Sequence, residues 1–351
     1  MFTSFLRRRG PAFLTAGAAA AAVLGLAVPA GASAATLAQP PLAASAGHGN
    51  RAMTAGIKVT ATIRVGKEPG QAAVDPKTNR IYVANEASNT VSVINGRTNK
   101  VVATIRGFSA PYGVAVNPKT NRIYVSDTYG IGRVSVISGW TNKVLTTISL
   151  HLTDQSVVGA DPQLNRVYVA NGGTSNVKVI NGFTNKVITT IWLDPTFPDQ
   201  IAVNPYSHRI YLADQENYDV RVISGLTGKV IASVFISDFP VLGVAVNPHT
   251  DMVYASASIG DVVAIDGRTN QFVNGIAACQ EARAVAVNPH TNTIYVTDDV
   301  GNTLTAINGQ TNTVEAAVGV GHGPLAVAAN PVTGKVYVVN DYDGTVSVVS
   351  P

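Results

Sequence analysis

Disulfide bonds, helical periodicity and the common catalytic motifs are all missing from this sequence. Its 351 residues include one cysteine, Cys279, which excludes an intramolecular disulfide. No stretch after the N-terminal region has a convincing helical period. Nucleophile-elbow, zincin and phosphate-loop motifs do not occur. The fold must therefore rest on packed β-structure, and the roughly 295 residues from Ile57 onward are enough to bury a stable core without a disulfide.

The N-terminus has the pattern of an export signal. Arg7–Arg9 are followed by an apolar, alanine-rich run over Ala12–Val28 and by the small residues Ala32–Ala34. This order predicts a cleaved signal peptide over residues 1–34 and a secreted or periplasmic protein, with Sec and Tat export both open. A retained membrane anchor is the alternative. The Ala-, Gly- and Pro-rich residues 35–56 are expected to form a flexible leader, with no stable membrane insertion after cleavage.

Removal of the signal leaves almost no net charge. The whole chain has 25 Lys and Arg against 21 Asp and Glu, a net charge of +4. Three arginines leave with the signal, so 22 basic and 21 acidic residues remain. The balance by itself does not indicate nucleic-acid binding.

A motif that recurs seven times organises the rest of the chain. Its proline recurs at intervals of 41 to 44 residues, and a tyrosine follows each proline six residues later. The prolines are Pro76, Pro118, Pro162, Pro205, Pro248, Pro289 and Pro331, and the tyrosines are Tyr82, Tyr124, Tyr168, Tyr211, Tyr254, Tyr295 and Tyr337. A period in the low forties built from short β-type runs is typical of β-propeller blades.

Each repeat divides into four strands, A to D, by alternation and turn chemistry. In the first repeat they are expected at Gln71–Asp75, Arg80–Asn85, Thr90–Asn95 and Lys100–Arg106. Pro76 suits the second position of a tight turn, and Asn79 tolerates a left-handed backbone. Gly96 is expected at the C–D corner for the same conformational reason.

The strand count predicts how the ring closes. The seventh repeat stops at its strand C, Thr345–Ser350, while Ile57–Arg64 matches the strand D sequence Lys100–Arg106. An N-terminal strand that completes the last blade leaves no bare sheet edge. We therefore predict an all-β, seven-bladed propeller of four-stranded antiparallel blades over residues 57–351, closed by its N-terminal strand and monomeric.

The strand B motif resembles the YVTN family of β-propeller repeats. It reads YVAN at Tyr82–Asn85, YVSD at Tyr124–Asp127, YVAN at Tyr168–Asn171, YLAD at Tyr211–Asp214, YASA at Tyr254–Ala257, YVTD at Tyr295–Asp298 and YVVN at Tyr337–Asn340. The resemblance covers residues 57–351. It implies a seven-bladed propeller that is secreted or periplasmic and surface-layer-like. Similar propellers are binding proteins or non-catalytic subunits, and occasionally lyases or lactonases.

The expected loops divide the charges between two faces. In a propeller the D–A and B–C loops share one face, called here the top, and the A–B and C–D loops share the underside. Of the 21 acidic residues, 16 fall in or beside top loops, whereas most Lys and Arg fall in underside loops. An acidic top and a basic underside would steer partners by charge. Duplication of one ancestral turn is the alternative origin of this pattern.

Candidate ligand-binding residues lie where the top loops meet the central channel. The first residue of strand A is small or apolar in most repeats, but it is Tyr112, Asp199 or Arg283 in three of them. Glu281 and the buried-type cysteine Cys279 stand beside Arg283. The histidines expected in top loops are His151 and His322, which are the candidates for acid–base chemistry. Asn or Asp at the end of strand B is interpreted as an Asx-turn former, so no metal and no cofactor is expected.

A second set of candidates follows the C–D glycine in three successive repeats. Trp140, Phe183 and Leu226 are each followed three residues later by a lysine, namely Lys143, Lys186 and Lys229. If exposed, they form an apolar row rimmed by lysine on the underside, suited to a protein, a cell-wall polymer or stacked bases. The alternative, slightly preferred, is that each apolar side chain folds back onto its own turn.

The sequence therefore favours a secreted, non-catalytic propeller that binds an unknown protein, cell-wall polymer or small molecule through the loop faces of the ring. A top-face enzyme of lyase or lactonase type, using His151, His322, Asp199 and Glu281, is the second hypothesis. Polyanion or nucleic-acid binding by the basic underside is the third, and the small net charge weighs against it.

Overall fold

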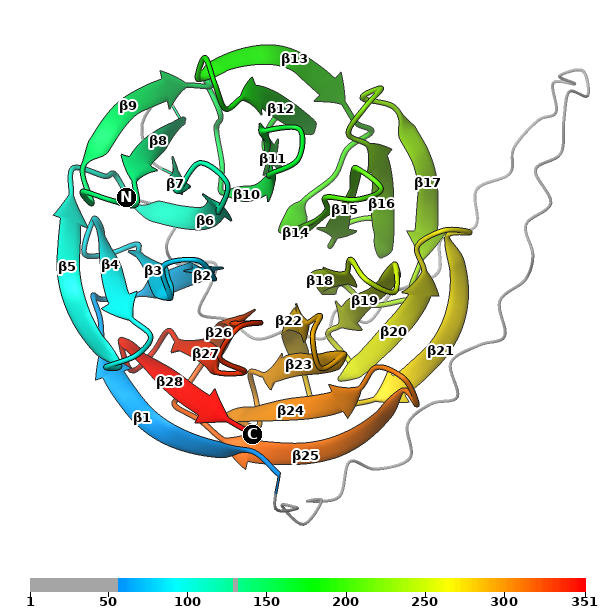
Figure 1. Ribbon diagram of the computed structural model, residues 1–351. Helices are drawn as coiled ribbons and strands as arrows, with labels where there is room; N and C mark the ends of the chain where they lie inside the picture. The colour runs from blue at the N-terminus through cyan, green and yellow to red at the C-terminus, as the bar shows by residue number, and fades with distance from the viewer. Residues whose placement is uncertain (1–55, 129–131) are drawn as a thin grey trace, which may run out of the picture. The chain divides into compact units, whose positions relative to one another are not determined.

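The fold is a closed ring of seven antiparallel sheets (Figure 1). The computed structural model describes residues 56–128 and 132–351, in which 28 strands and no helix occur. The expected signal peptide and all of the expected leader except Gly56 lie outside the described residues. Each sheet has four strands, and the innermost strand of every sheet contacts the innermost strand of the next, around to the first. The sequence prediction of seven four-stranded blades is confirmed.

Blades are numbered in chain order, each with strands A to D from the channel outward. Blade 1 is β2(Pro69–Asp75), β3(Arg80–Asn85), β4(Thr90–Asn95) and β5(Lys100–Arg106), and blade 2 is β6(Pro111–Asn117), β7(Arg122–Asp127), β8(Arg133–Ser138) and β9(Val144–Ser149). Blade 3 is β10(Ser156–Asp161), β11(Arg166–Asn171), β12(Asn176–Asn181) and β13(Lys186–Trp192), and blade 4 is β14(Pro198–Asn204), β15(Arg209–Asp214), β16(Asp219–Ser224) and β17(Val230–Phe235). Blade 5 is β18(Val241–Asn247), β19(Met252–Ala257), β20(Asp261–Asp266) and β21(Gln271–Ala277), and blade 6 is β22(Ala282–Asn288), β23(Thr293–Asp298), β24(Thr303–Asn308) and β25(Thr313–Gly319). Blade 7 is β26(Pro324–Ala329), β27(Val336–Asn340), β28(Thr345–Ser350) and β1(Lys58–Arg64).

The ring closes through its N-terminal strand. β1 pairs antiparallel with β28, so that Arg64 lies opposite Thr345 and Lys58 opposite Ser350. Ile63 of β1 is buried in a core cluster with Val346 of β28. The predicted closure is confirmed. It removes the bare edge that β28 would otherwise present.

The repeated tyrosines pack between blades. All seven are buried almost completely, which explains why the motif keeps a large ring at this position. The hydroxyl of Tyr168 in blade 3 donates to the Gly225 carbonyl in the C–D turn of blade 4 at 3.4 Å, and Tyr254 in blade 5 donates to Gly309 in blade 6 at 3.2 Å. Burial raises the pKa of Tyr168 to about 12, so the ring stays neutral. Each such tyrosine joins one blade to the next.

Turn chemistry fixes the A–B corner as predicted, but the C–D glycine has another role. Asn79 has a φ of 51°, in the left-handed region expected for it. In the C–D turn the left-handed residue is Asn99, with a φ of 54°, and not Gly96. A Cβ on Gly96 would lie 2.7 Å from the Tyr337 hydroxyl oxygen and still closer to the Asn79 side chain. The conformational reason given for Gly96 was therefore wrong: the position needs glycine because Asn79 of the same blade and Tyr337 of the neighbouring blade both approach it closely.

Hydrogen bonds between loops confirm the assignment of the two faces. On the top, the B–C loop joins the D–A loop through Glu86 N–H and the Glu68 carbonyl at 2.8 Å. On the underside, the C–D turn joins the A–B turn through Gly96 N–H and the Asn79 carbonyl at 2.8 Å. Equivalent bonds recur around the ring. The top loops that hold most of the carboxylates therefore share one face.

Candidate ligand site at the channel mouth

Six of the seven innermost strands are irregular at their top ends. Their register with strand B shifts by one residue there, whereas β10 of blade 3 pairs regularly. The strand A residues that have no partner in strand B are Gly70, Gln71, Tyr112, Gly113, Asp199, Leu242, Arg283, Ala284 and Leu325. A bulge re-aims the side chain that it carries. The three candidates from the start of strand A, Tyr112, Asp199 and Arg283, are thus all bulged residues.

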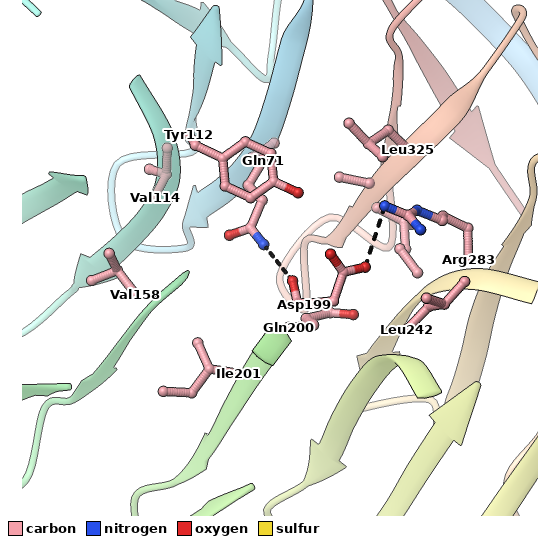
Figure 2. A pocket seen from close by; sticks show the side chains of 14 residues that line it. Gln71, Tyr112, Val114, Val158, Asp199, Gln200, Ile201, Leu242, Arg283 and Leu325 are labelled. Atoms are coloured by element: carbon pink, nitrogen blue, oxygen red, sulfur yellow. Dashed lines mark hydrogen bonds and ion pairs between the residues drawn. The ribbon is translucent and has the colours of Figure 1, made fainter. Parts of the chain in front are cut away.

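Seven of these nine residues, all except Gly70 and Gly113, line a cavity of about 110 Å³ in the central channel (Figure 2). Five polar side chains line it: Gln71, Tyr112, Asp199, Gln200 and Arg283. The remaining lining is apolar and comes from Ala72, Val114, Val158, Ile201, Leu242, Ala284, Leu325, Ala326 and Val327. All seven blades contribute at least one residue. A few polar groups set in an apolar wall are typical of a small-molecule site.

A charge pair spans one side of the cavity. Arg283 Nη2 of blade 6 lies 3.3 Å from Asp199 Oδ2 of blade 4, with blade 5 between them. Their side chains are 20% and 10% exposed, respectively. A charge so far removed from water is costly unless an opposite charge compensates it. The structure thus brings together two of the candidates that the sequence places two blades apart.

Two glutamines that the sequence analysis missed brace the same cavity. Gln71 Nε2 of blade 1 donates to the Asp199 carbonyl across the channel at 3.4 Å. Gln200 Nε2 donates to the Val285 carbonyl at 3.1 Å, and Gln200 Oε1 accepts from Val244 N–H at 3.2 Å. The equivalent position in the other repeats is Gly, Ala or Val. The polar amide at this position was therefore the sequence signal that could have identified both glutamines.

Tyr112 contributes an aromatic wall. It is buried and belongs to a core cluster, and its hydroxyl is directed into the cavity in Figure 2. A Cβ on Gly70 would lie 2.9 Å from the Tyr112 ring. The ring therefore fits here because residue 70 has no side chain. Ser156 opens the regular strand β10 and does not line the cavity.

Three predicted site residues do not join this group. Glu281, His151 and His322 belong to D–A loops, and none of them lines the cavity. Burial raises the pKa of Glu281, nearby Asp299 adds to the rise, and Arg283 opposes it. His151 is exposed. His322 is also exposed and lies 3.1 Å from Asp343, and its N–H groups lower the pKa of that carboxyl.

Cys279 and the Asx residues have structural roles. Cys279 is buried, its Sγ lies 3.9 Å from the Gly260 carbonyl oxygen, and burial raises the pKa of its thiol. A buried, protonated thiol is a poor nucleophile. Asn171, Asp214 and Asp298 accept hydrogen bonds from the loop that follows strand B, as expected of Asx turns. No group of three or more metal-ligating side chains occurs within residues 56–128 and 132–351.

The underside candidates are exposed. Trp140 and Phe183 are each 74% exposed and Leu226 is 59% exposed, so the expectation that they fold back onto their turns is wrong. Lys143, Lys186 and Lys229 are exposed as well. The side chains cannot fold back because the turn beneath them is already filled by a tyrosine and an arginine from the preceding blade, as Tyr168 and Arg166 show at Gly225.

Two underside histidines, His249 and His290, lie side by side. The rings of His249 and His290 stack at 5.8 Å between centroids, and Tyr206 stacks on His249 at 6.3 Å. His290 Nδ1 lies 2.7 Å from the Pro331 carbonyl oxygen, which directs its Nε2 away from the backbone. The stack belongs to the A–B turns of blades 4, 5 and 6, on the opposite face from the polar cavity.

Comparison with known proteins identifies the fold alone. No family model matches the chain, and no curated protein matches it. Among solved structures, it is similar to Kuenenia stuttgartiensis hydrazine synthase, with a TM-score of 0.73 and 16% sequence identity, over 81% of this chain and 96% of that chain. None of the described segments is a helix long and apolar enough to cross a bilayer. The chain is thus a seven-bladed β-propeller whose channel mouth contains an unusual concentration of polar side chains.

Proposed function

We propose that this protein is an exported, non-catalytic, YVTN-type propeller that binds a small polar ligand at its channel mouth. One observation carries the proposal: five polar side chains from blades 1, 2, 4 and 6 converge on one cavity, most of them from bulged strand ends. Such a concentration departs from the repeat, in which these positions are mostly small or apolar. A departure confined to one site is expected where binding has been added to a repetitive scaffold.

The chemistry of the lining favours a small zwitterion. The cavity of about 110 Å³ is small beside the usual range of ligand pockets, so a compound of a few heavy atoms fits it. An ammonium group can replace Arg283 beside Asp199, while a carboxylate can accept a bidentate contact from Arg283. Gln71 and Gln200 supply neutral amides on either side, and Tyr112 supplies an aromatic face. The ligand would then exchange one ion pair for two.

The geometry gives less support to a lyase or lactonase. The residues proposed for acid–base chemistry, His151, His322 and Glu281, do not line the cavity, and Asp199 is engaged by Arg283. A general base must be within hydrogen-bond reach of the proton that it removes. Binding without chemistry is therefore the function that this site supports best.

Export and the YVTN assignment rest on the sequence. The residues 1–34 have the order of charges, apolar residues and small residues that a signal peptidase recognises. The seven strand B motifs keep their tyrosine, and the fold gives that tyrosine a role between blades. Both points support the proposal.

Thermal-shift and calorimetric titration of the mature protein test it. The panel contains glycine, alanine, serine and glycine betaine, with acetate and methylamine as singly charged comparisons. We expect at least one zwitterion, and neither comparison, to raise Tm by roughly 5 °C at a hundredfold excess over Kd. The double change Asp199→Ala with Arg283→Ala should abolish the shift.

The matched control is Asp238→Ala with Arg106→Ala, which removes the same two charges from exposed top-face positions outside the cavity. This control should bind like the wild type. The proposal is wrong if no zwitterion binds, or if the Asp199/Arg283 variant binds as well as the control.

A further inference from the structure

A row of exposed apolar side chains follows the outer edge of blades 2, 3 and 4. It combines the three exposed C–D turn residues with one exposed residue from each outer strand, β9, β13 and β17. These strands lie at the circumference of the ring in Figure 1. We call this set the apolar strip: Trp140, Leu145, Phe183, Ile188, Leu226 and Ile231, all of them exposed. The corresponding turn residue in blades 1, 5 and 6 is Arg97, Arg268 or Gln310, so the turn tips are apolar in these three consecutive blades only.

The outer-strand members of the strip are bulged residues. In β13, Val179 pairs with Thr189 and Ile180 pairs with Val187, which leaves Ile188 outside the ladder. The same shift leaves out Leu145 in β9 and Ile231 in β17. A bulge at this position interrupts the edge on which another strand would add. A partner must therefore bind through side chains and not by extending the sheet.

The turn of one blade meets the outer strand of the preceding blade. Ile188 and Ile191 of blade 3 and Leu226 of blade 4 line one pocket of about 110 Å³. Phe183 occupies the equivalent turn position in blade 3. The strip is thus a row of apolar tips with at least one pocket of side-chain size between them, a shape that accepts an anchoring side chain.

The three tips are held rigidly from below. Arg80 Nη1 donates to the Gly139 carbonyl at 2.6 Å, Arg122 Nη1 to Gly182 at 2.8 Å, and Arg166 Nη1 to Gly225 at 2.5 Å. Each carbonyl belongs to the peptide bond that immediately precedes Trp140, Phe183 or Leu226. Each arginine comes from the preceding blade. Preorganised apolar anchors lose little conformational freedom on binding.

The charge around the strip has one sign. Lys143, Lys186 and Lys229 are exposed beside the tips, and residues 139–149, 182–192 and 225–235 contain no Asp or Glu. Blade 6 differs, because Glu315 is the bulged residue of β25. A surface with apolar anchors and a lysine rim complements apolar side chains flanked by carboxylates.

We propose that the apolar strip is the docking surface for a protein partner that presents apolar side chains flanked by Asp or Glu. A symmetric contact with a second copy would place lysines opposite lysines, which opposes association. A flat bilayer suits the strip poorly, because the strip bends around three of the seven blades at the edge of the ring (Figure 1). The pocket beside Leu226 fits a protein side chain. This inference is independent of the ligand proposed for the channel mouth.

Selection from a displayed library of random 20-residue peptides tests the proposal. The mature protein is the bait, and the variant Phe183→Ser with Leu226→Ser removes non-specific binders. We expect enriched peptides to combine apolar residues with Asp or Glu. A synthetic consensus peptide should lose at least tenfold in affinity for the Phe183/Leu226 variant, and binding should weaken as salt rises.

The control variant is Val300→Ser with Val332→Ser, two exposed apolar residues outside the strip, and it should bind the peptide normally. Melting temperatures of both variants should match the wild type, because all four residues are exposed. Four results would overturn the proposal: no enrichment over the Phe183/Leu226 variant; a consensus without acidic residues; strip-dependent binding to phosphatidylglycerol vesicles, which would assign the surface to membranes; or strip-dependent self-association in sedimentation velocity, which would assign it to a second copy.

Discussion

At the scale of single residues, the chain places ionisable groups in dry surroundings on several blades and compensates them locally. Asp199 with Arg283 is one example and Arg221 is another, because it lies within 4 Å of Asp194, Asp214 and Asp219. Arg221 and Asp219 are both buried. One guanidinium serving three carboxylates leaves the group short of positive charge, so protonation of one carboxyl is favoured.

The pH dependence of stability should show that one carboxyl group of this cluster is protonated more readily than usual. Burial raises the pKa of Asp219 to about 6, Asp214 adds to the rise, and Arg221 opposes it. The unfolded value is about 3.9. Between these values the folded state holds the proton more tightly than the unfolded state, so stability falls as pH rises through that window. Relative to Asp219→Asn, the wild type should lose on the order of 1–3 kcal/mol between pH 4 and 7.

Urea unfolding of the wild type and Asp219→Asn at several pH values from 4 to 7 measures this difference. The variant also loses the contact with Arg221, which changes its free energy of unfolding at every pH. The readout is therefore the difference between the two proteins in the slope of the free energy of unfolding against pH. Parallel stability curves for the two proteins would show that Asp219 ionises without penalty in the folded state.

Residue-scale prediction from sequence succeeded where the cause is local and failed where it depends on a neighbouring blade. Asn79 was predicted to adopt a left-handed backbone because its own side chain tolerates that conformation. The reason for Gly96 was wrong because the Asn79 side chain and the Tyr337 hydroxyl, which belongs to the neighbouring blade and lies far away in the sequence, leave no room for a Cβ. The exposure of Trp140 was also misjudged, because Arg80 of the preceding blade already fills the space under its turn.

At the scale of elements, alternation and turn residues were sufficient to place strands. In the first repeat, β3, β4 and β5 match the expected bounds, and β2 begins two residues earlier than expected. That early start is the bulged end of the strand, and register depends on the partner strand, which the local sequence does not encode. The same limit hid the bulges of the outer strands. For the same reason Gln71 was not predicted to line the cavity, because the bulge determines which side chain faces the channel.

Removal of the closing strand should expose the element that it covers. Deletion of residues 57–65 leaves β28 with an unpaired edge and opens the core around Ile63, which packs with Val346 and Val348. We expect aggregation or dimerisation, measured by size-exclusion chromatography with light scattering. Deletion of residues 41–49, in the expected leader, is the length-matched control and should remain monomeric. A monomeric 57–65 deletion with an unchanged Tm would contradict the role assigned to β1.

At the scale of the whole molecule, closure joins the two ends of the folded chain. The Thr60 hydroxyl donates to the Val348 carbonyl at 3.1 Å, across 288 residues of sequence. Blade 7 therefore forms only after the last strand of the chain is available. Long-range pairing of this kind is slow, because the loop that it closes includes nearly the whole domain.

This order has a consequence for the proposed export. If the protein crosses a membrane unfolded, the ring closes only on the far side, when β1 pairs with β28. We expect extracellular or periplasmic material to begin near Ala35 and to sediment as a monomer of the closed ring. N-terminal sequencing and sedimentation velocity of the exported protein measure both. A soluble protein that retains Met1 would contradict the signal peptide, and a stable dimer would contradict closure within one chain.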